Sequence, residues 1–368
     1  MPVQHKYRPQ QLVLAIALAL GCADVASAQQ PAPPSPENAS DAIEQLGAGT
    51  IANLVNATLN SDSSVSAAML SAMRQSDSAS GFSSQKRASR PTAADNSASR
   101  VWLQALGYGG TLDRDYDALK YSTQGLVLGA DWAFDEEWRI GMMAGKSQTR
   151  LDSRDLNGDL ESWHLGAYAL RQSGSMSLRL GASYSNHDGS TQRQVTFNGF
   201  SDRPKGRYDA NTQQAFAEVG YNLGRANINI EPFAGLGYQR YQRDGYTEKG
   251  GTAALKVEGQ EQNNLNSTFG LRLAKINTLD NGMQLTPRFS ASWKHTYGEI
   301  ATKTRQRLIT DGRKDTVSGA PLDRDSLMVD AGLELGLSAQ HTLGVGINGE
   351  MGTDSRNHGA TAQWRMTF

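Results

Sequence analysis

The sequence of 368 residues has a single cysteine, Cys22, and no excess of charge of either sign. Lys and Arg number 36 against 37 Asp and Glu, so nothing attracts nucleic acid and no nucleic-acid partner is expected. No apolar run of 18 residues follows the first 28, and the mean hydropathy is −0.52, which excludes a bundle of membrane helices. The mean hydropathy does not exclude a transmembrane β-barrel, because polar and apolar residues alternate along its strands.

The sequence also lacks a metal-ligand cluster, a phosphate-binding loop and a nucleotide fingerprint. Six histidines are present. His187-Asp188 is reminiscent of outer-membrane proteases, but we read both as solvated residues at a strand end. Ser292 and His295 differ by three positions and fall on opposite faces of a strand, which excludes a nucleophile–base pair. His164 and His341 are single polar positions, so we expect no cofactor, no metal and no enzymatic activity.

The first 28 residues have the pattern of a secretory signal peptide. Lys6 and Arg8 precede the apolar run Leu12–Leu20, and Ala26-Ser27-Ala28 is a small-residue cleavage site. We therefore predict cleavage after Ala28. The alternative is lipoprotein processing at Cys22, but the leucine expected three residues earlier is missing. Cleavage after Ala28 leaves the mature chain without a thiol.

Two polar segments flank a helical region. Residues 29–40 are Pro-rich and too short to fold, which indicates a tether or a vestigial passenger segment. Residues 76–99 are rich in Ser and Ala and indicate a flexible connector.

The region between them, residues 41–75, predicts two helices. Apolar residues recur at helical spacing, then Asn60-Ser61-Asp62 interrupts the pattern, with Asp62 as the N-cap of the second helix. That second helix, around Val65–Arg74, consists mostly of Ala, Ser and Met. One interpretation is a small amphipathic helix packed on a surface, and the other is a helix narrow enough to pass through a pore. Because a polar-lined tube is predicted directly after it, we predict that it plugs this barrel.

Residues 100–368 alternate between polar and apolar with period two. The alternating runs number about twelve, an even number as bacterial outer-membrane barrels require. We therefore predict an all-β membrane protein, an antiparallel transmembrane β-barrel of about twelve strands with an N-terminal α-helix in its lumen. The expected localisation is the bacterial outer membrane, with membrane lipid as a partner and a monomeric state.

The polar faces of the strands carry charges of both signs. An Arg or Lys side chain that faced lipid near the bilayer midplane would destabilise the inserted barrel by roughly 2–4 kcal/mol. We therefore predict that these charges face the lumen: Arg139, Arg179, Glu218, Glu231, Arg272, Arg288, Asp330, Glu334 and Arg365. The opposite faces end in aromatic residues typical of the interfacial girdles of membrane barrels. A soluble barrel with the inverted pattern would have no apolar core left.

The connections between the runs alternate in length. Short turns are expected at 135–137, 173–175, 224–226 and 280–282, and long polar loops at 189–210, 244–263 and 300–324. Short turns are typical of the periplasmic end of such barrels and long loops of the extracellular end.

The final run, Ala360–Phe368, alternates strictly up to the last residue. It resembles the closing strand of bacterial outer-membrane barrels, where a terminal Phe is read by the barrel-assembly machinery. On this resemblance, Trp364, Met366 and Phe368 are the assembly signal.

Several motifs together resemble the translocator domain of type Va autotransporters. They are Ile230–Tyr238, Gly245–Leu255, Trp293–Gly298, Asp325–Leu333 and Thr342–Gly346, with Ala42–Leu46, Ala52-Asn53 and Asp62-Ser63 resembling the linker that precedes the barrel. Gly47 and Ile51 replace the Ser and His usual in that linker. The likeness covers nearly everything from Ala42 to Phe368.

The resemblance implies a twelve-stranded barrel in the outer membrane of a Gram-negative bacterium, plugged by the preceding helix. Helped by the assembly machinery and periplasmic chaperones, such a barrel brings its N-terminal passenger to the cell surface by type V secretion. Here we expect almost no passenger. Some autotransporters cut the linker in the lumen by Asn chemistry beside an acid, which makes Asn53, Asn56 and Asn60 candidates by residue type. The alternative is an outer-membrane pore or a barrel-embedded hydrolase.

Overall fold

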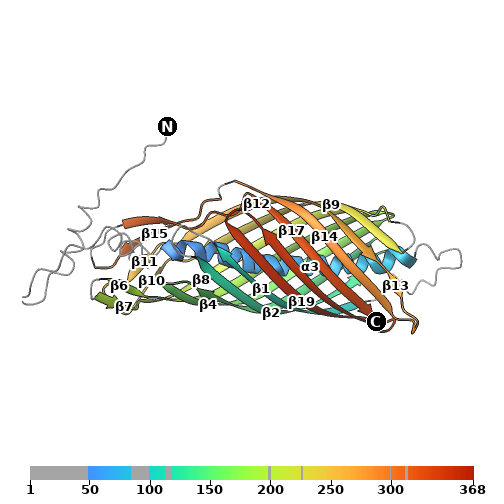
Figure 1. Ribbon diagram of the computed structural model, residues 1–368, viewed down its shortest axis with the longest axis horizontal. Coiled ribbons are helices and arrows are strands. Elements are labelled where there is room, and N and C mark those ends of the chain that lie inside the picture. The colour runs from blue at the N-terminus through green and yellow to red at the C-terminus, as the bar shows by residue number, and fades with distance from the viewer. Residues whose placement is uncertain are drawn as a thin grey trace, which may run out of the picture.

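The structure is a computed structural model of the chain, shown in Figure 1. It describes residues 49–83, 99–112, 118–197, 200–224, 227–298, 300–310 and 314–368. The predicted signal peptide, the tether and the start of the linker fall in residues 1–48, outside the described residues, as do residues 84–98 of the predicted connector.

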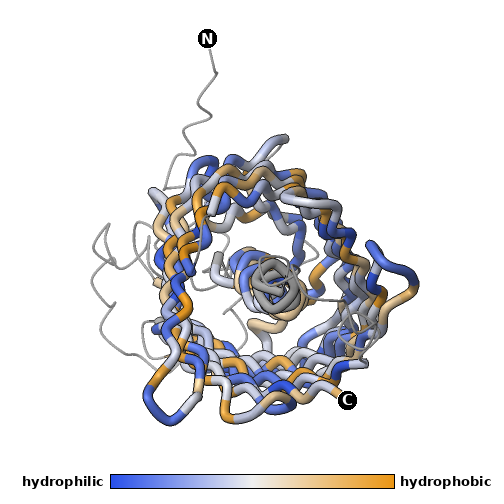
Figure 2. The backbone as a smooth tube through the Cα atoms, turned by 90° about the vertical axis from the view of Figure 1, so that its right-hand side faces the viewer, coloured by the Kyte–Doolittle hydropathy of each residue, from blue (hydrophilic) through white to orange (hydrophobic). Residues whose placement is uncertain are grey.

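Twelve antiparallel strands form a closed barrel, which confirms the predicted fold and strand number (Figures 1 and 2). They are β1 (Arg100–Leu112), β2 (Leu119–Ala133), β3 (Trp138–Asp152), β4 (Leu156–Ser173), β5 (Met176–Arg193), β8 (Lys205–Tyr221), β9 (Ile228–Arg243), β12 (Gln260–Lys275), β14 (Gln284–Tyr297), β17 (Asp325–Gly336), β18 (His341–Met351) and β19 (Ser355–Thr367). Each pairs with its neighbours along the chain, and β1 pairs with β19, which closes the ring.

The two ends of the barrel differ. Turns such as 134–137 and 174–175 connect strands at the end where β1 begins and β19 ends. The opposite end, here called the loop end, carries the extra strands β6 (Val195–Phe197), β7 (Phe200–Asp202), β10 (Tyr246–Thr247), β11 (Leu255–Val257), β15 (Lys303–Leu308) and β16 (Lys314–Ser318). Strands β10, β11, β15 and β16 form one small sheet; the two-residue β13 (Asn277–Thr278) lies at the short-turn end.

The prediction that 189–210 is a loop is wrong over half of its length. β5 continues to Arg193 and β8 already begins at Lys205, so only residues 194–204 leave the barrel wall. The extensions are polar outward but bury small and aromatic side chains inward, a pattern that a search for outward apolar residues does not find.

One long helix lies inside the barrel (Figure 2). A 3-10 turn, η1 (Gly49–Asn53), begins at the loop end and leads directly into α3 (Leu54–Ser83). The predicted break at 60–62 is therefore wrong, and residues 76–83 of the predicted connector are helical. Among the described residues, no helix combines the length and apolar composition needed to cross a membrane.

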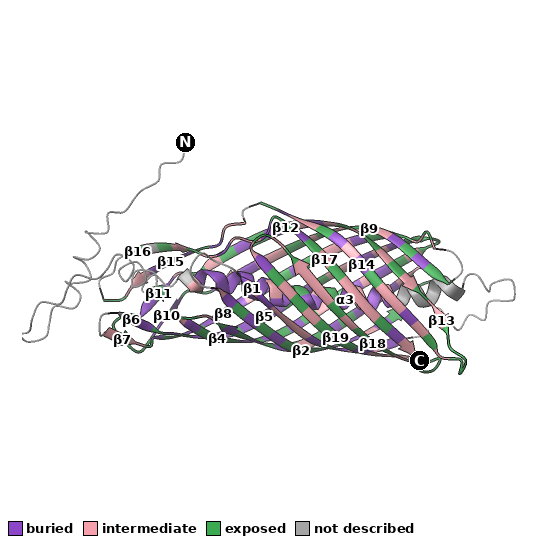
Figure 3. Ribbon diagram, in the orientation of Figure 1, coloured by how far each residue is buried: buried purple, intermediate pink, exposed green. Residues whose placement is uncertain are grey.

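The outward faces of the strands divide the barrel into two regions. In the apolar belt, towards the short turns, exposed residues are apolar, among them Leu128, Met142, Leu165, Val219, Leu236, Leu327 and Val345. At the loop end, for example Lys146–Asp152 of β3 and Lys205–Gln213 of β8, outward residues are polar. Figure 3 shows the alternation of exposed and buried residues that runs through both regions.

The interior of the loop end is an apolar core around the start of α3. The core residues include Ile51, Leu54, Val55, Leu59, Leu112, Leu119, Leu151, Leu156, Leu160, Tyr208, Tyr241, Tyr246 and Leu255. Burial raises the pKa of Tyr246 to about 12, so its phenol stays neutral at neutral pH. The inverted pattern that the sequence argument discounted for the whole barrel is thus present in this region.

In the belt, α3 presents the predicted apolar stripe to one side of the wall. Val65, Ala68, Met69, Ala72 and Met73 pack on Trp102, Leu106, Val127 and Met143. These wall residues come from β1, β2 and β3. The same helix therefore contributes to an apolar cluster in each region of the barrel.

Candidate functional site

The lumen and its helix form the candidate site, and Asp62 anchors the first third of α3 to the wall. Asp62 is 1% exposed. Its Oδ1 accepts a hydrogen bond from Ser185 Oγ at 2.8 Å and lies 3.2 Å from Nδ1 of His164. Its Oδ2 lies 3.9 Å from Nε2 of His187. A helix carboxylate thus lies between two imidazoles on β4 and β5.

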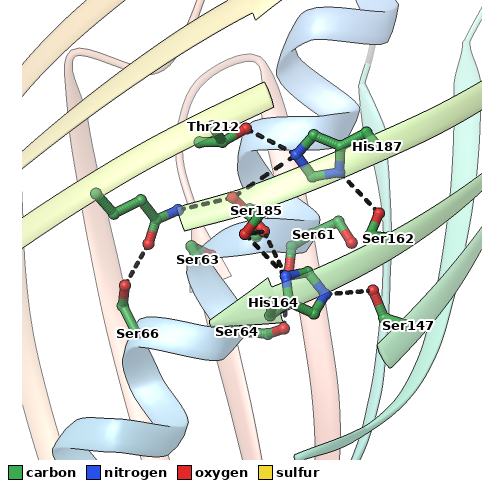
Figure 4. Close-up of polar contacts among 12 residues, drawn as sticks. Ser61, Ser63, Ser64, Ser66, Ser147, Ser162, His164, Ser185, His187 and Thr212 are labelled. Atoms are coloured by element: carbon green, nitrogen blue, oxygen red, sulfur yellow. Dashed lines mark hydrogen bonds and ion pairs between the residues drawn. The ribbon is translucent and has the colours of Figure 1, made fainter. Parts of the chain in front are cut away.

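Wall hydroxyls also bind the ring nitrogens of His164 and His187, as Figure 4 shows. His164 Nε2 lies 2.8 Å from Ser147 Oγ. His187 Nδ1 lies 2.7 Å from Ser162 Oγ, and its Nε2 lies 2.9 Å from Thr212 Oγ1. Because every nitrogen of both rings has a partner, the cluster is a fully bonded anchor for the helix.

Ser147, His164 and Asp62 follow the bonding order of a hydrolase triad. All three are at most 5% exposed, and neither lumen cavity described below is lined by Ser147 or His164. A substrate has no described route to the hydroxyl. The cluster therefore gives no support to the hydrolase alternative.

A second anchor lies closer to the short turns. Arg74 of α3 donates from Nη2 to Glu218 Oε2 at 2.8 Å. Arg179, which is fully buried, bonds Glu218 at 2.8 Å and Glu231 at 2.9 Å. Arg272 pairs with both carboxylates. Three guanidinium groups therefore surround two carboxylates, and one of the three belongs to the helix.

The other predicted lumen charges also lie inside the barrel. Arg139 pairs with Asp131 at 2.8 Å, Arg288 pairs with Glu334 at 2.8 Å, Asp330 accepts from Ser290 at 3.4 Å, and Arg365 donates to Gln75 of α3 at 3.2 Å. Arg139 and Arg288 are thus each neutralised by a carboxylate on the adjacent strand, whereas the contacts given for Asp330 and Arg365 are to neutral side chains.

The helix does not fill the lumen. It contacts β1 to β5, β8 and β9 and leaves cavities of about 260 Å³ and about 180 Å³ towards the remaining wall from β8 to β19. Arg74, Tyr108 and Asp330 line both cavities. Within the described ranges, no group of His, Cys, Asp or Glu is arranged to hold a metal ion.

In each of the two residue pairs that the sequence analysis considered for catalysis, the structure places the two side chains on opposite faces of a strand. His187 faces inward and is 1% exposed, whereas Asp188 faces outward, so the solvated reading of His187 is wrong. Ser292 faces inward and His295 outward, as expected, and His341 stacks on Trp364. The sequence analysis does not identify the Asp62 cluster, because it assigns Asp62 to a helix N-cap. The signal was the inward alternation of Ser162 with His164 and of Ser185 with His187.

The candidate asparagines hold the start of the helix at the loop end. Ala320 donates its backbone N–H to Asn53 Oδ1 at 2.5 Å, and its carbonyl accepts from Asn56 Nδ2 at 2.7 Å. Asn60 lines the larger cavity. In the described part of the chain, the hydrogen bonds of the Asn53 and Asn56 side chains go to the backbone of Ala320, and linker cleavage stays a prediction.

The predicted assembly signal lies on the outer wall. Phe368 is 61% exposed and exchanges two backbone hydrogen bonds of 3.0 Å with Ser99. Trp364 and Met366 share its face. The role of these residues as a signal stays a prediction.

A closed twelve-stranded barrel with an apolar belt, a charged lumen and a helix inside defines an outer-membrane translocator barrel. Residues 101–348 match the family described as "Autotransporter beta-domain", and the chain belongs to this family. The family resemblance is thereby confirmed. The chain is an autotransporter translocator domain of the bacterial outer membrane, and the domain family is not itself catalytic.

Similar proteins agree with this assignment. An "Extracellular serine protease" from Serratia marcescens is 30% identical over 332 residues, which are 88% of this chain but 31% of the relative. "Esterase EstA" from Pseudomonas aeruginosa is 27% identical over 184 residues, 46% of this chain and 28% of the relative. The chain thus spans about a third of the length of these curated relatives.

Solved structures share the fold. The translocator domain of the autotransporter NalP from Neisseria meningitidis has a TM-score of 0.61 at 17% identity, covering 82% of this chain and 98% of that domain. The β-domain of the Bordetella autotransporter BrkA has a TM-score of 0.55 at 17% identity, covering 74% of this chain and all of that domain.

Proposed function

We propose that this barrel brings the chain segment ahead of η1 to the bacterial surface and then keeps α3 in its lumen. The supporting observation is the direction of the helix. It begins among the long loops and ends towards the short turns, where β1 starts. A segment that precedes Gly49 would therefore leave the barrel at the extracellular end.

We propose further that export uses no catalytic group of this chain. Asp62 and Arg74 serve instead to hold the helix after passage, each bonded to the wall on one side of the lumen. Barrel insertion would depend on the assembly machinery reading Trp364, Met366 and Phe368, on periplasmic chaperones, and on a monomeric barrel. Deleting Phe368 should then reduce the amount of heat-modifiable barrel in the outer membrane.

Epitope accessibility on intact cells tests the export proposal. A tag inserted directly before Gly49 should bind antibody without permeabilisation, as should a tag in the 352–354 turn at the loop end. A tag in the 280–282 turn should bind only after permeabilisation. A tag before Gly49 that stays inaccessible while the 352–354 tag is accessible would overturn the proposal.

A further inference from the structure

A dense group of rings lies on the outer wall of β12, β14 and β17. Trp293, His295 and Tyr297 alternate outward along β14, with Phe269 of β12 directly opposite Trp293 and Asp325 of β17 directly opposite His295. We call these five residues the ring platform.

The rings form a continuous ladder. Phe269 stacks on Trp293 with centroids 6.2 Å apart and planes at 21°. His295 lies 5.6 Å from Trp293 and 4.7 Å from Tyr297. Three of the four rings are more than 40% exposed, so the ladder is accessible from the outside.

Polar groups complete the platform. Asp325 accepts hydrogen bonds from Trp293 Nε1 at 3.0 Å and from His295 Nδ1 at 2.7 Å, both at Oδ1. Its side chain is 55% exposed, which leaves Oδ2 available to an outside donor. Arg324 precedes it and is exposed, with one guanidinium nitrogen 3.4 Å from the Gly298 carbonyl.

The platform lies at the outer boundary of the apolar belt. Towards the short turns, the outward residues of the same strands are apolar, with Phe289 on β14 and Leu327 and Val329 on β17. Towards the loops, Arg324 directly precedes β17, and on β12 the exposed Leu265 lies opposite Tyr297. This is the depth at which lipid headgroups begin, where amphipathic rings are favoured.

We propose that the ring platform binds the phosphorylated sugar headgroup of an outer-leaflet glycolipid. Ring faces suit the C–H face of a sugar, and the free carboxylate oxygen of Asp325 can accept from a sugar hydroxyl or amide. The Arg324 guanidinium matches a phosphate, to which it can donate two parallel hydrogen bonds. The inference depends on the outer-membrane location of the barrel and not on export.

Another aromatic residue at the same boundary lacks the neighbours of the ring platform and represents an ordinary residue of the interfacial aromatic girdle. Trp163 on β4 is 63% exposed, and among the described residues no other aromatic ring stacks on it. Lys146 lies 5.3 Å over it, and that amine is already paired with Glu161 at 2.9 Å. This site offers one ring, and its amine is already paired, so it serves as the matched control.

Binding of one defined glycolipid to the purified full chain tests the proposal. The probe is a bisphosphorylated, acylated glucosamine disaccharide lipid in detergent, followed by native mass spectrometry, with phosphatidylglycerol as the competing anionic lipid. We expect selective binding of the glycolipid, weakened about tenfold by Trp293→Leu or Arg324→Gln and unchanged by Trp163→Leu. Removing the phosphates should weaken binding to the parent chain but hardly affect Arg324→Gln.

Heat-modifiable migration would verify that each variant is folded, and the exposed Arg324→Gln keeps the test open if Trp293→Leu fails to fold. Equal binding of the two lipids, or equal losses in the Trp163 and Trp293 variants, would overturn the proposal. Because the export assay with the tag before Gly49 uses other residues, failure of one proposal leaves the other standing.

Discussion

The belt and the loop end use the same strands with opposite polarity. On β8, Val219 faces outward in the belt and Glu218 faces the lumen, whereas nearer the loops Tyr208 faces inward and Arg207 outward. The difference follows from the solvent that each outward face meets. Lipid favours apolar residues outside and leaves charges to the lumen, whereas water outside restores the usual arrangement of a soluble barrel.

The helix joins these two interiors. Its first turns carry Leu54 and Val55 into the apolar core of the loop end, and Arg74 enters the charged network of the belt. Asp62 lies between them, beside His164 and next to the belt boundary marked by Trp163. The apolar start of the helix therefore matches the apolar core of the loop end, and its Arg74 matches the charged lumen of the belt. A helix running in the opposite direction would not make both matches.

The largest effect is expected from breaking the charged network of the belt. Replacing Arg179 by Met leaves Glu218 and Glu231 buried with less compensation, which should lower the free energy of unfolding by about 3–5 kcal/mol. Reversible unfolding in lipid vesicles measures it. Arg171→Met, which breaks a half-exposed pair with Glu137, should change little, and equal losses in both variants would contradict a buried network.

The loop end should respond to loss of apolar volume. Leu160 is 1% exposed inside its core, so Leu160→Ala should cost about 2–5 kcal/mol in unfolding free energy. The neighbouring Asp159 faces water, so Asp159→Ala should lower the unfolding free energy much less. If the two substitutions proved equally harmful, this end of the barrel would not have an apolar interior.

In the belt, the outward apolar residue should be more sensitive to substitution than the inward charged one. Leu333 faces lipid and is 49% exposed, so Leu333→Arg should destabilise the inserted barrel by roughly 2–4 kcal/mol. Glu334→Gln, one residue along, keeps a hydrogen-bond acceptor for Arg288 beside a lumen cavity and should cost far less. A costlier Glu334→Gln would mean that the register of β17 is inverted.

The helix anchor should have a smaller effect. Asp62→Asn keeps the shape but removes one acceptor oxygen, which should cost roughly 1–3 kcal/mol in a fully buried cluster. The matched control is Asp188→Asn, which is exposed on the other face of β5. Chemical unfolding of the two purified variants compares them, and a harmless Asp62→Asn would remove this anchor from the account.

Local alternation predicted much of this structure. Each outward and inward position on β17, and the face shared by Trp364, Met366 and Phe368, follows from period two alone. The charge argument similarly predicted that Arg179 and Glu218 lie inside the barrel, where the structure has them.

What could not be predicted depends on contacts far apart in the sequence. Asn60-Ser61-Asp62 has the composition of a helix break, yet Ser61 bonds Thr149 at 3.0 Å and Asp62 bonds Ser185, so the wall satisfies groups that would otherwise cap a helix. The small sheet at the loop end pairs β11 with β15, about fifty residues apart, and no local pattern gives that pairing.

The central claim is that α3 occupies the lumen of a closed barrel, and single-channel conductance in planar bilayers tests it most directly. Deleting residues 54–83 should raise the conductance several-fold over the full chain, because the helix takes up space beside cavities of about 260 Å³ and about 180 Å³. Heat-modifiable migration verifies that the shortened barrel is folded. A folded deletion variant with the conductance of the full chain would contradict the account.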